Sequence, residues 1–72
     1  MKHILTILML ITIQYTVAAG DTLQSIAEQY CPGTDAVQVA EFREGIRELN
    51  YELVGEGEVW PGMEIQINKW EG

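Results

Sequence analysis

The chain has 72 residues, of which 11 are acidic and 4 are basic, and its formal net charge is −7. This length allows one small domain, whose thin core favours a surface groove over a deep, water-excluded catalytic pocket. So few cationic side chains exclude nucleic acid as a partner, and the acidic charge disfavours an anionic membrane surface. A neutral, hydroxyl-rich partner such as a glycan fits this composition.

Residues that carry catalysis or bind metals are scarce. Cys31 is the only cysteine, so neither an internal disulfide nor a cysteine-rich zinc site can form, and we expect it to be a small buried hydrophobe. His3 has no carboxylate or second histidine at ligand spacing, and Ser25 has no histidine partner. The sequence therefore predicts a protein that is not an enzyme and that uses no metal and no cofactor.

An apolar segment, Ile4–Ile13, follows Lys2 and allows three interpretations. A basic start, a short apolar stretch and the small residues at 17–19 are typical of a signal peptide. The second interpretation is a membrane anchor, although ~20 apolar residues are needed to span a bilayer. The third is an ordered strand that lengthens the domain or pairs with another copy, because isoleucine and threonine favour strands. We divide the chain into a leader at residues 1–14 and a domain at residues 15–70.

The first elements of the domain follow from residue periodicity. Alternation of apolar and polar residues predicts a half-buried strand at 14–18, with one face formed by Ile13, Tyr15 and Val17. Gly20 ends this strand, and Asp21 or Thr22 caps a two-turn helix, a role that we expect to be the main one of Asp21. The helix has an apolar face of Leu23, Ile26 and Tyr30. Pro32-Gly33 ends it.

A second, amphipathic helix is predicted between Asp35, which caps it, and Asn50, which closes it in the left-handed conformation. Its apolar stripe is formed by Val39, Phe42, Ile46 and Leu49. Glutamates and arginines cover the outside and are expected to be a solvated face with some Glu–Arg pairing. Gly45 within this helix indicates the close approach of a neighbouring element.

Residues 51–58, which include two glycines and three glutamates, are predicted to form a mobile loop with an exposed Tyr51 ring. Its carboxylates are expected to be solubilising, since a glycosidase pair must be held ~5–10 Å apart across a sugar. Trp60-Pro61-Gly62 is typical of a turn. Trp60 is assigned to the core, and the place of Trp70 stays open. The last strand has an apolar face of Met63, Ile65 and Ile67.

The order strand, helix, helix, strand predicts an α+β fold in which a two-stranded antiparallel sheet packs on two helices. Motifs within these elements are Tyr15-Thr16-Val17, Gly20-Asp21-Thr22-Leu23, Ile26-Ala27, Tyr30, Leu49-Asn50, Trp60-Pro61-Gly62 and Ile65-Gln66-Ile67. Together they resemble the LysM (lysin motif) family of carbohydrate-binding modules. The long spacing from Tyr30 to Asn50 resembles a small Firmicute-type variant with an amino-terminal hydrophobic segment.

The resemblance implies a βααβ fold and binding of glycans that contain N-acetylglucosamine, such as peptidoglycan or chitin. It also implies a groove between the strand–helix loop and the loop after the second helix. Carried onto this chain, one wall is Gly20, Asp21, Thr22 and Leu23, and the other is Asn50, Tyr51, Leu53 and Val54. The free N–H groups at a helix start can meet an acetamido carbonyl, and Gly20 allows close approach to the backbone.

Two functional hypotheses follow. The first is a non-catalytic module that binds peptidoglycan at the bacterial cell envelope, either secreted or anchored in a membrane through Ile4–Ile13. The second is a structural or assembly protein, such as a phage-tail protein or an oligomer, that uses the same fold without binding sugar. In the second hypothesis, the apolar segment is an ordered strand through which copies associate.

Overall fold

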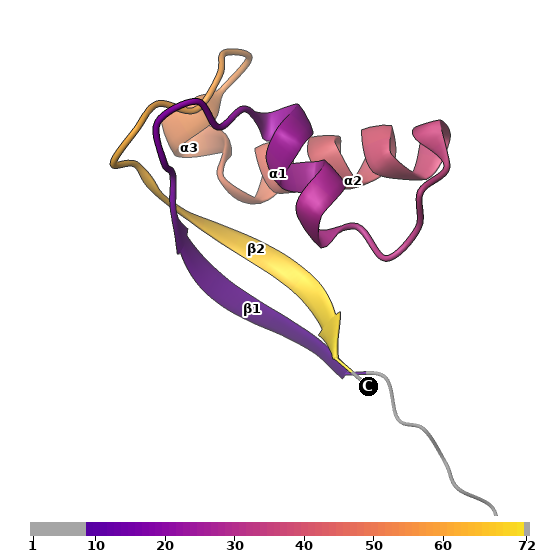
Figure 1. Ribbon diagram of the computed structural model, residues 1–72. Coiled ribbons are helices and arrows are strands. Elements are labelled where there is room, and N and C mark those ends of the chain that lie inside the picture. Colours follow the sequence, from indigo (N-terminus) through magenta and orange to yellow (C-terminus); the bar gives the residue numbers. More distant parts are fainter. Residues whose placement is uncertain (1–8, 72) are drawn as a thin grey trace, which may run out of the picture.

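The computed structural model describes residues 9–71 as a two-stranded ribbon with a layer of helices on one side (Figure 1). The elements are β1 (Met9–Thr16), α1 (Leu23–Tyr30), α2 (Ala36–Leu49), α3 (Tyr51–Val54) and β2 (Glu64–Glu71). The predicted α+β class and the antiparallel pairing of the strands are confirmed. Among residues 9–71, no helix is long and apolar enough to cross a membrane.

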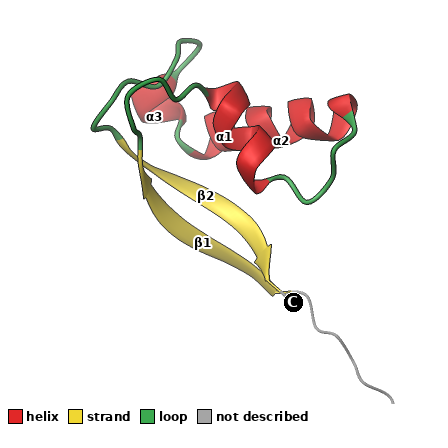
Figure 2. Ribbon diagram, viewed as in Figure 1, coloured by secondary structure: helices red, strands yellow, loops and turns green. Residues whose placement is uncertain are grey.

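The sheet is an antiparallel ladder that runs from the pair Met9↔Glu71 to the pair Thr16↔Glu64 (Figure 2). Two further hydrogen bonds extend it beyond β1: the Val17 N–H donates to the Met63 carbonyl, and the Gly62 N–H donates to the Val17 carbonyl, both at 2.8 Å. The strand that we predicted at 14–18 thus begins earlier, at Met9, and ends at Thr16.

This longer strand bears on the apolar segment at the start of the chain. Residues 9–13, which we placed in the leader, pair with residues 67–71 of β2, so the boundary drawn after residue 14 falls inside β1. Their isoleucine and threonine content suits such a pleated, half-buried surface. Residues 4–8 of the apolar segment lie outside the described part of the chain.

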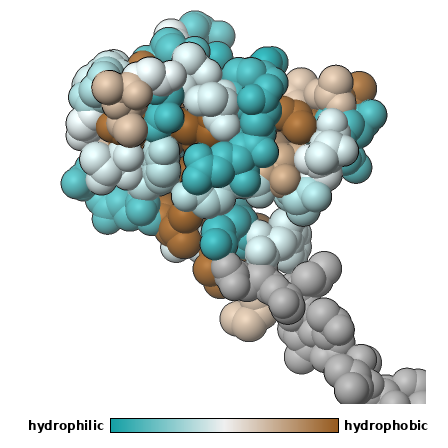
Figure 3. Space-filling view, in the orientation of Figure 1, coloured by the Kyte–Doolittle hydropathy of each residue, from teal (hydrophilic) through white to brown (hydrophobic). Residues whose placement is uncertain are grey.

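The core lies between the ribbon and the helices, and every element contributes to it or packs against it. Its buried members are Val17, Leu23, Ile26, Ala27, Val39, Ile46, Val54, Val59, Met63, Ile65 and Ile67. The inward face predicted for the last strand is confirmed, since Met63, Ile65 and Ile67 are all buried. Figure 3 shows hydrophilic residues over most of the helical layer, with hydrophobic ones between them and on the ribbon.

The helix starts are fixed by side chains that satisfy free N–H groups. Thr22 caps α1 in a reciprocal arrangement with Ser25: the Ser25 N–H donates to the Thr22 hydroxyl at 3.0 Å, and the Thr22 N–H donates to the Ser25 hydroxyl at 2.9 Å. Asp35 caps α2 by accepting from the Val37 and Gln38 N–H groups, as predicted. Cys31, predicted to be buried, is partly exposed where the chain leaves α1.

Several local predictions for α2 and the segment after it are wrong. A Cβ built at Gly45 would meet nothing within 4 Å, so no element approaches closely there. Asn50 has φ −116°, not a left-handed conformation, and its side chain donates a hydrogen bond to the Gln66 carbonyl in β2. Residues 51–54 are helical as α3, so the predicted mobile loop is not a loop throughout. Trp60, which we assigned to the core, is 54% exposed. It lies next to the turn in which Gly62 has φ 89°.

Candidate functional site

The first predicted wall is a tight turn between β1 and α1. Gly20 has φ 89°, a backbone conformation that residues with a side chain disfavour. It is exposed, so a ligand can approach its backbone closely. The Asp21 N–H donates to the Ala18 carbonyl at 3.0 Å and closes the turn. The structure therefore presents Gly20, Asp21 and Thr22 at the surface just before the start of α1.

We had expected Asp21 to cap the helix, but it does not. Its Oδ2 accepts hydrogen bonds from the Tyr15 hydroxyl at 2.6 Å and from the Ala18 N–H at 2.9 Å. These two bonds lower the pKa of Asp21. The bond to Asp21, followed by burial, raises the pKa of Tyr15 to about 12. Asp21 thus fixes the turn to the end of β1 and leaves the capping of α1 to Thr22.

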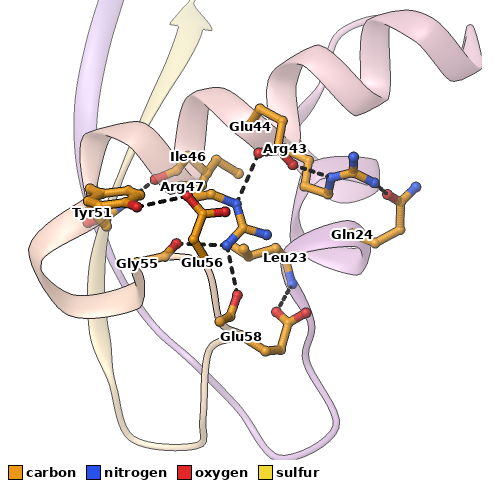
Figure 4. A network of polar contacts seen from close by, with 12 residues as sticks. Leu23, Gln24, Arg43, Glu44, Ile46, Arg47, Tyr51, Gly55, Glu56 and Glu58 are labelled. Atoms are coloured by element: carbon orange, nitrogen blue, oxygen red, sulfur yellow. Dashed lines mark hydrogen bonds and ion pairs between the residues drawn. The ribbon is translucent and has the colours of Figure 1, made fainter.

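Leu23 contributes backbone, not side chain, to the surface. Its side chain is 1% exposed and belongs to the core. Its N–H donates to Oε2 of Glu58 at 2.6 Å, and the same oxygen accepts from the Val59 N–H at 3.1 Å. The first N–H of α1 therefore faces a carboxylate from the opposite side of the predicted groove (Figure 4).

Asn50 and Val54 of the second wall act from inside the fold. The Asn50 side chain is buried, and its Nδ2 donates to the Ile46 carbonyl at 2.7 Å and to the Gln66 carbonyl at 2.8 Å. Its Oδ1 accepts from the Gln66 N–H at 2.8 Å. Val54 is a core residue. Neither side chain is exposed to a ligand, and both hold α3 in place.

Tyr51 and Leu53 are the exposed members of the second wall, at 50% and 52%. The Tyr51 hydroxyl donates to Glu56 at 2.8 Å, which raises the pKa of Tyr51. Both residues line a cavity of about 450 Å³ whose other lining residues are Gln14, Glu48, Leu49, Asn50, Glu52, Glu64 and Gln66. The residues of the first wall do not line this cavity. The structure thus brings together three members of the second wall and keeps them apart from the first.

The segment 55–58 joins the two walls, and sequence reasoning missed its role. Arg47 Nη1 donates to the carbonyls of Gly55 and Gly57, both at 2.8 Å, and its Nε donates to Glu44 at 3.0 Å. Figure 4 shows Arg47 reaching from α2 under this segment, with Glu58 turned toward α1. The Glu–Arg pairing that we expected on this face is present between Arg47 and Glu44, and Glu58 is exposed as expected, but their contacts with Gly55, Gly57 and Leu23 were not predicted.

In the structure, the hydrogen-bonded turn before α1 faces the ordered segment that follows α2. The resemblance implies such an arrangement of the strand–helix loop and the loop after the second helix. A comparison with protein families matches the LysM domain to residues 15–68. The chain belongs to the LysM domain family. No curated protein and no solved structure matches it.

LysM domains are carbohydrate-binding modules that recognise glycans containing N-acetylglucosamine, are generally non-catalytic, and typically act outside the cell or at its envelope. Across residues 9–71 of this LysM domain, His, Cys, Asp and Glu side chains form no group suited to holding a metal ion. The chemistry that the walls offer is therefore hydrogen bonding from backbone and hydroxyl groups, together with contact by exposed rings and alkyl groups.

Proposed function

We propose that this LysM domain binds the glycan strands of peptidoglycan at the bacterial cell envelope and carries out no catalysis. The observation that carries the proposal is the start of α1, where the Leu23 N–H donates to the Glu58 carboxylate beside an exposed glycine turn. Glu58 holds a carboxylate oxygen at this N–H, which is the kind of acceptor that an acetamido carbonyl supplies. The family match supports the choice of an N-acetylglucosamine glycan.

In this proposal the residues of the two walls have different tasks. Gly20, Asp21 and Thr22 are exposed or partly exposed and supply backbone and hydroxyl groups to the sugar. The Leu23 N–H binds the acetamido carbonyl when that oxygen replaces the Glu58 carboxylate. Tyr51 and Leu53 supply exposed apolar surface for sugar faces and acetyl methyl groups. Asn50 and Val54 keep α3 in position.

The test is a titration of the isotope-labelled chain with N-acetylglucosamine oligomers, followed through backbone amide shifts. Saturable shifts at residues 20–23 and 50–54 are expected. A folded spectrum without shifts at millimolar sugar would refute binding of these oligomers. Shifts confined to residues 50–54, Gln14 and Gln66 would move the site to the cavity of about 450 Å³ and refute the two-wall groove.

Two matched substitutions sharpen the titration. Tyr51→Ala removes an exposed ring from the second wall, and Trp70→Ala removes an equally exposed ring (50% in both) near the far end of the ribbon. Stacking of a nucleic-acid base on an aromatic ring is worth ~1–3 kcal/mol. Taking the lower part of that range for a sugar face, we expect Tyr51→Ala to weaken binding about tenfold and Trp70→Ala to leave it unchanged. Binding to insoluble peptidoglycan compared with chitin then distinguishes the two glycans.

A second candidate function, assembly without sugar binding, is favoured by one observation. Residues 9–13 of the apolar segment lie in an ordered strand that pairs with β2. An ordered strand at this place is what we expect of an assembly protein. The same titration separates the candidates, since an assembly protein of this kind gives no saturable shifts with sugar.

A further inference from the structure

The outer edge of β1 is the open side of the sheet. Within residues 9–71 the sheet consists of the two strands β1 and β2, and Figure 1 shows the helices on the β2 side of the ribbon. In this part of the chain, no backbone hydrogen bond ties β1 to a segment other than its partner strand. An exposed row of N–H and C=O groups is a template for pairing with another strand.

The hydrogen bonds of Asn50 reveal which groups of β1 face outward. Asn50 takes both the N–H and the C=O of Gln66, so these groups point away from β1. Gln14 and Gln66 are opposite each other and therefore form a non-hydrogen-bonded pair of the antiparallel ladder. The backbone groups of Gln14 consequently point away from β2. Because this alternation has a period of two, those of Leu10, Thr12 and Thr16 do the same.

The two edges of the sheet are treated differently. Asn50 covers the edge of β2 at Gln66, and α2 packs against that strand. The β1 sequence, MLITIQYT, contains no charged residue, proline or glycine, which are the usual protections against edge-to-edge pairing. The molecule carries a net charge of −7, so this uncharged strand is where two copies can meet with least repulsion.

We propose that β1 pairs antiparallel with β1 of a second copy, which joins the two ribbons into one continuous four-stranded sheet. The pairing is centred on Ile13, which lies opposite itself. This register places Leu10 opposite Thr16 and Thr12 opposite Gln14, so that every outward-facing residue of β1 meets another one. A register shifted by one residue would place outward-facing residues opposite inward-facing ones and lose these bonds.

Side chains fit this register on both faces of the sheet. On the helix-covered face, Ile13 meets Ile13 and Ile11 meets Tyr15, and all three are only partly buried within one copy. Aromatic and β-branched pairs of this kind stabilise antiparallel strands. On the other face, the pairs Leu10–Thr16 and Thr12–Gln14 are uncharged. The proposal does not depend on glycan binding, since the groove residues lie outside β1.

The first test measures the mass of the full chain by light scattering after size exclusion, from micromolar to millimolar concentration. A concentration-dependent dimer, twice the 8.1 kDa of one chain, is expected. A monomer at every concentration overturns the proposal. Thr12→Pro removes an outward N–H without touching the ladder to β2, and is expected to give a folded monomer, whereas Thr12→Val keeps the dimer. A folded Thr12→Pro dimer overturns the proposal as well.

The second test fixes the register by disulfide formation and does not depend on the folding of the proline variant. In a Cys31→Ser background, Ile13→Cys places thiols opposite each other across the two-fold axis and is expected to cross-link under oxidation. Ile11→Cys is the matched control, because in this register the two thiols lie about 13 Å apart along the strands, beyond the ~7 Å reach of a disulfide. No cross-link at residue 13, or equal cross-linking at residue 11, refutes the register.

Discussion

The hydrogen bond between the Tyr15 hydroxyl and the Asp21 carboxylate (2.6 Å) joins the end of β1 to the turn that precedes α1. It raises the pKa of Tyr15 from 10.0 to about 12 and lowers the pKa of Asp21 from 3.8. A raised tyrosine pKa stabilises the fold below pH 10, and this stabilisation disappears as the pH approaches about 12. A lowered aspartate pKa stabilises the fold above pH 3.8, and this is lost on further acidification.

We therefore predict the pH dependence of a single substitution, Tyr15→Phe. The difference in free energy of unfolding between the natural chain and this variant is expected to be largest between about pH 4 and pH 10 and to shrink beyond both limits. Urea unfolding followed by circular dichroism across this range measures it. Tyr51→Phe is the control for the contribution of Asp21, because the Tyr51 hydroxyl binds Glu56 and does not touch Asp21; the pKa of Tyr51 is raised too, so the acid limit separates the two variants. A difference that stays constant up to pH 12 would contradict the assignment.

At the scale of elements, Asn50 connects the end of α2 to the outer edge of β2, which it covers at Gln66. Its amide makes three hydrogen bonds to backbone groups, and the side chain is 6% exposed. A buried donor or acceptor that loses its partner costs about 1–3 kcal/mol. We predict that Asn50→Ala lowers the free energy of unfolding by at least ~2 kcal/mol, measured by urea unfolding.

The control for this substitution is Asn68→Ala on the same strand. Asn68 is partly exposed, and its side chain accepts from the Thr12 hydroxyl at 2.5 Å on the solvent-facing side of the ribbon. Exposed substitutions of this kind change stability by about 0.5 kcal/mol or less. Equal losses in the two variants would show that Asn50 contributes nothing beyond an ordinary surface contact.

The elements that were predicted correctly are those whose signals are local. Asp35 and the apolar stripe after it mark α2, and the alternation through Ile65 and Ile67 marks β2. The segment after α2 was predicted wrongly because long-range contacts order it. Arg47 binds carbonyls up to ten residues ahead, and Glu58 binds an N–H 35 residues behind. Neither contact has a signature in the neighbouring sequence.

The turn and the helix start of the candidate site were predictable in position, but the hydrogen bonds of each residue were not. The glycine turn and the helix start were located by their motif, and the structure presents them at the surface. Asp21 was expected to cap α1, but its carboxylate instead accepts a hydrogen bond from the hydroxyl of Tyr15, six residues earlier. Spacing alone does not distinguish an aspartate that caps from one that a distant hydroxyl reaches first, because both patterns begin with the same residues.

At the scale of the whole molecule, β1 is one of the two strands found in the described part of the chain, and it packs Ile13 and Tyr15 against the core. Two strands and a thin core leave a domain of this size little stability to lose. We predict that a chain beginning at Gly20, as cleavage after Ala19 would produce, does not fold, whereas one beginning at Met9 does. Circular dichroism and the dispersion of the amide-proton chemical shifts measure whether each of the two chains folds. A folded chain from Gly20 would show that β1 is dispensable.

The antiparallel ladder has a geometric consequence for how the domain is attached to anything else. Met9 and Glu71 are paired, so the described chain enters and leaves at neighbouring points, roughly 5 Å apart, as in any antiparallel pair. Figure 1 shows this shared exit at the opposite end of the ribbon from the turns that border the candidate site. A partner fused at either end therefore holds the domain by the same end of the ribbon, and both fusions present the turns that border the candidate site outward.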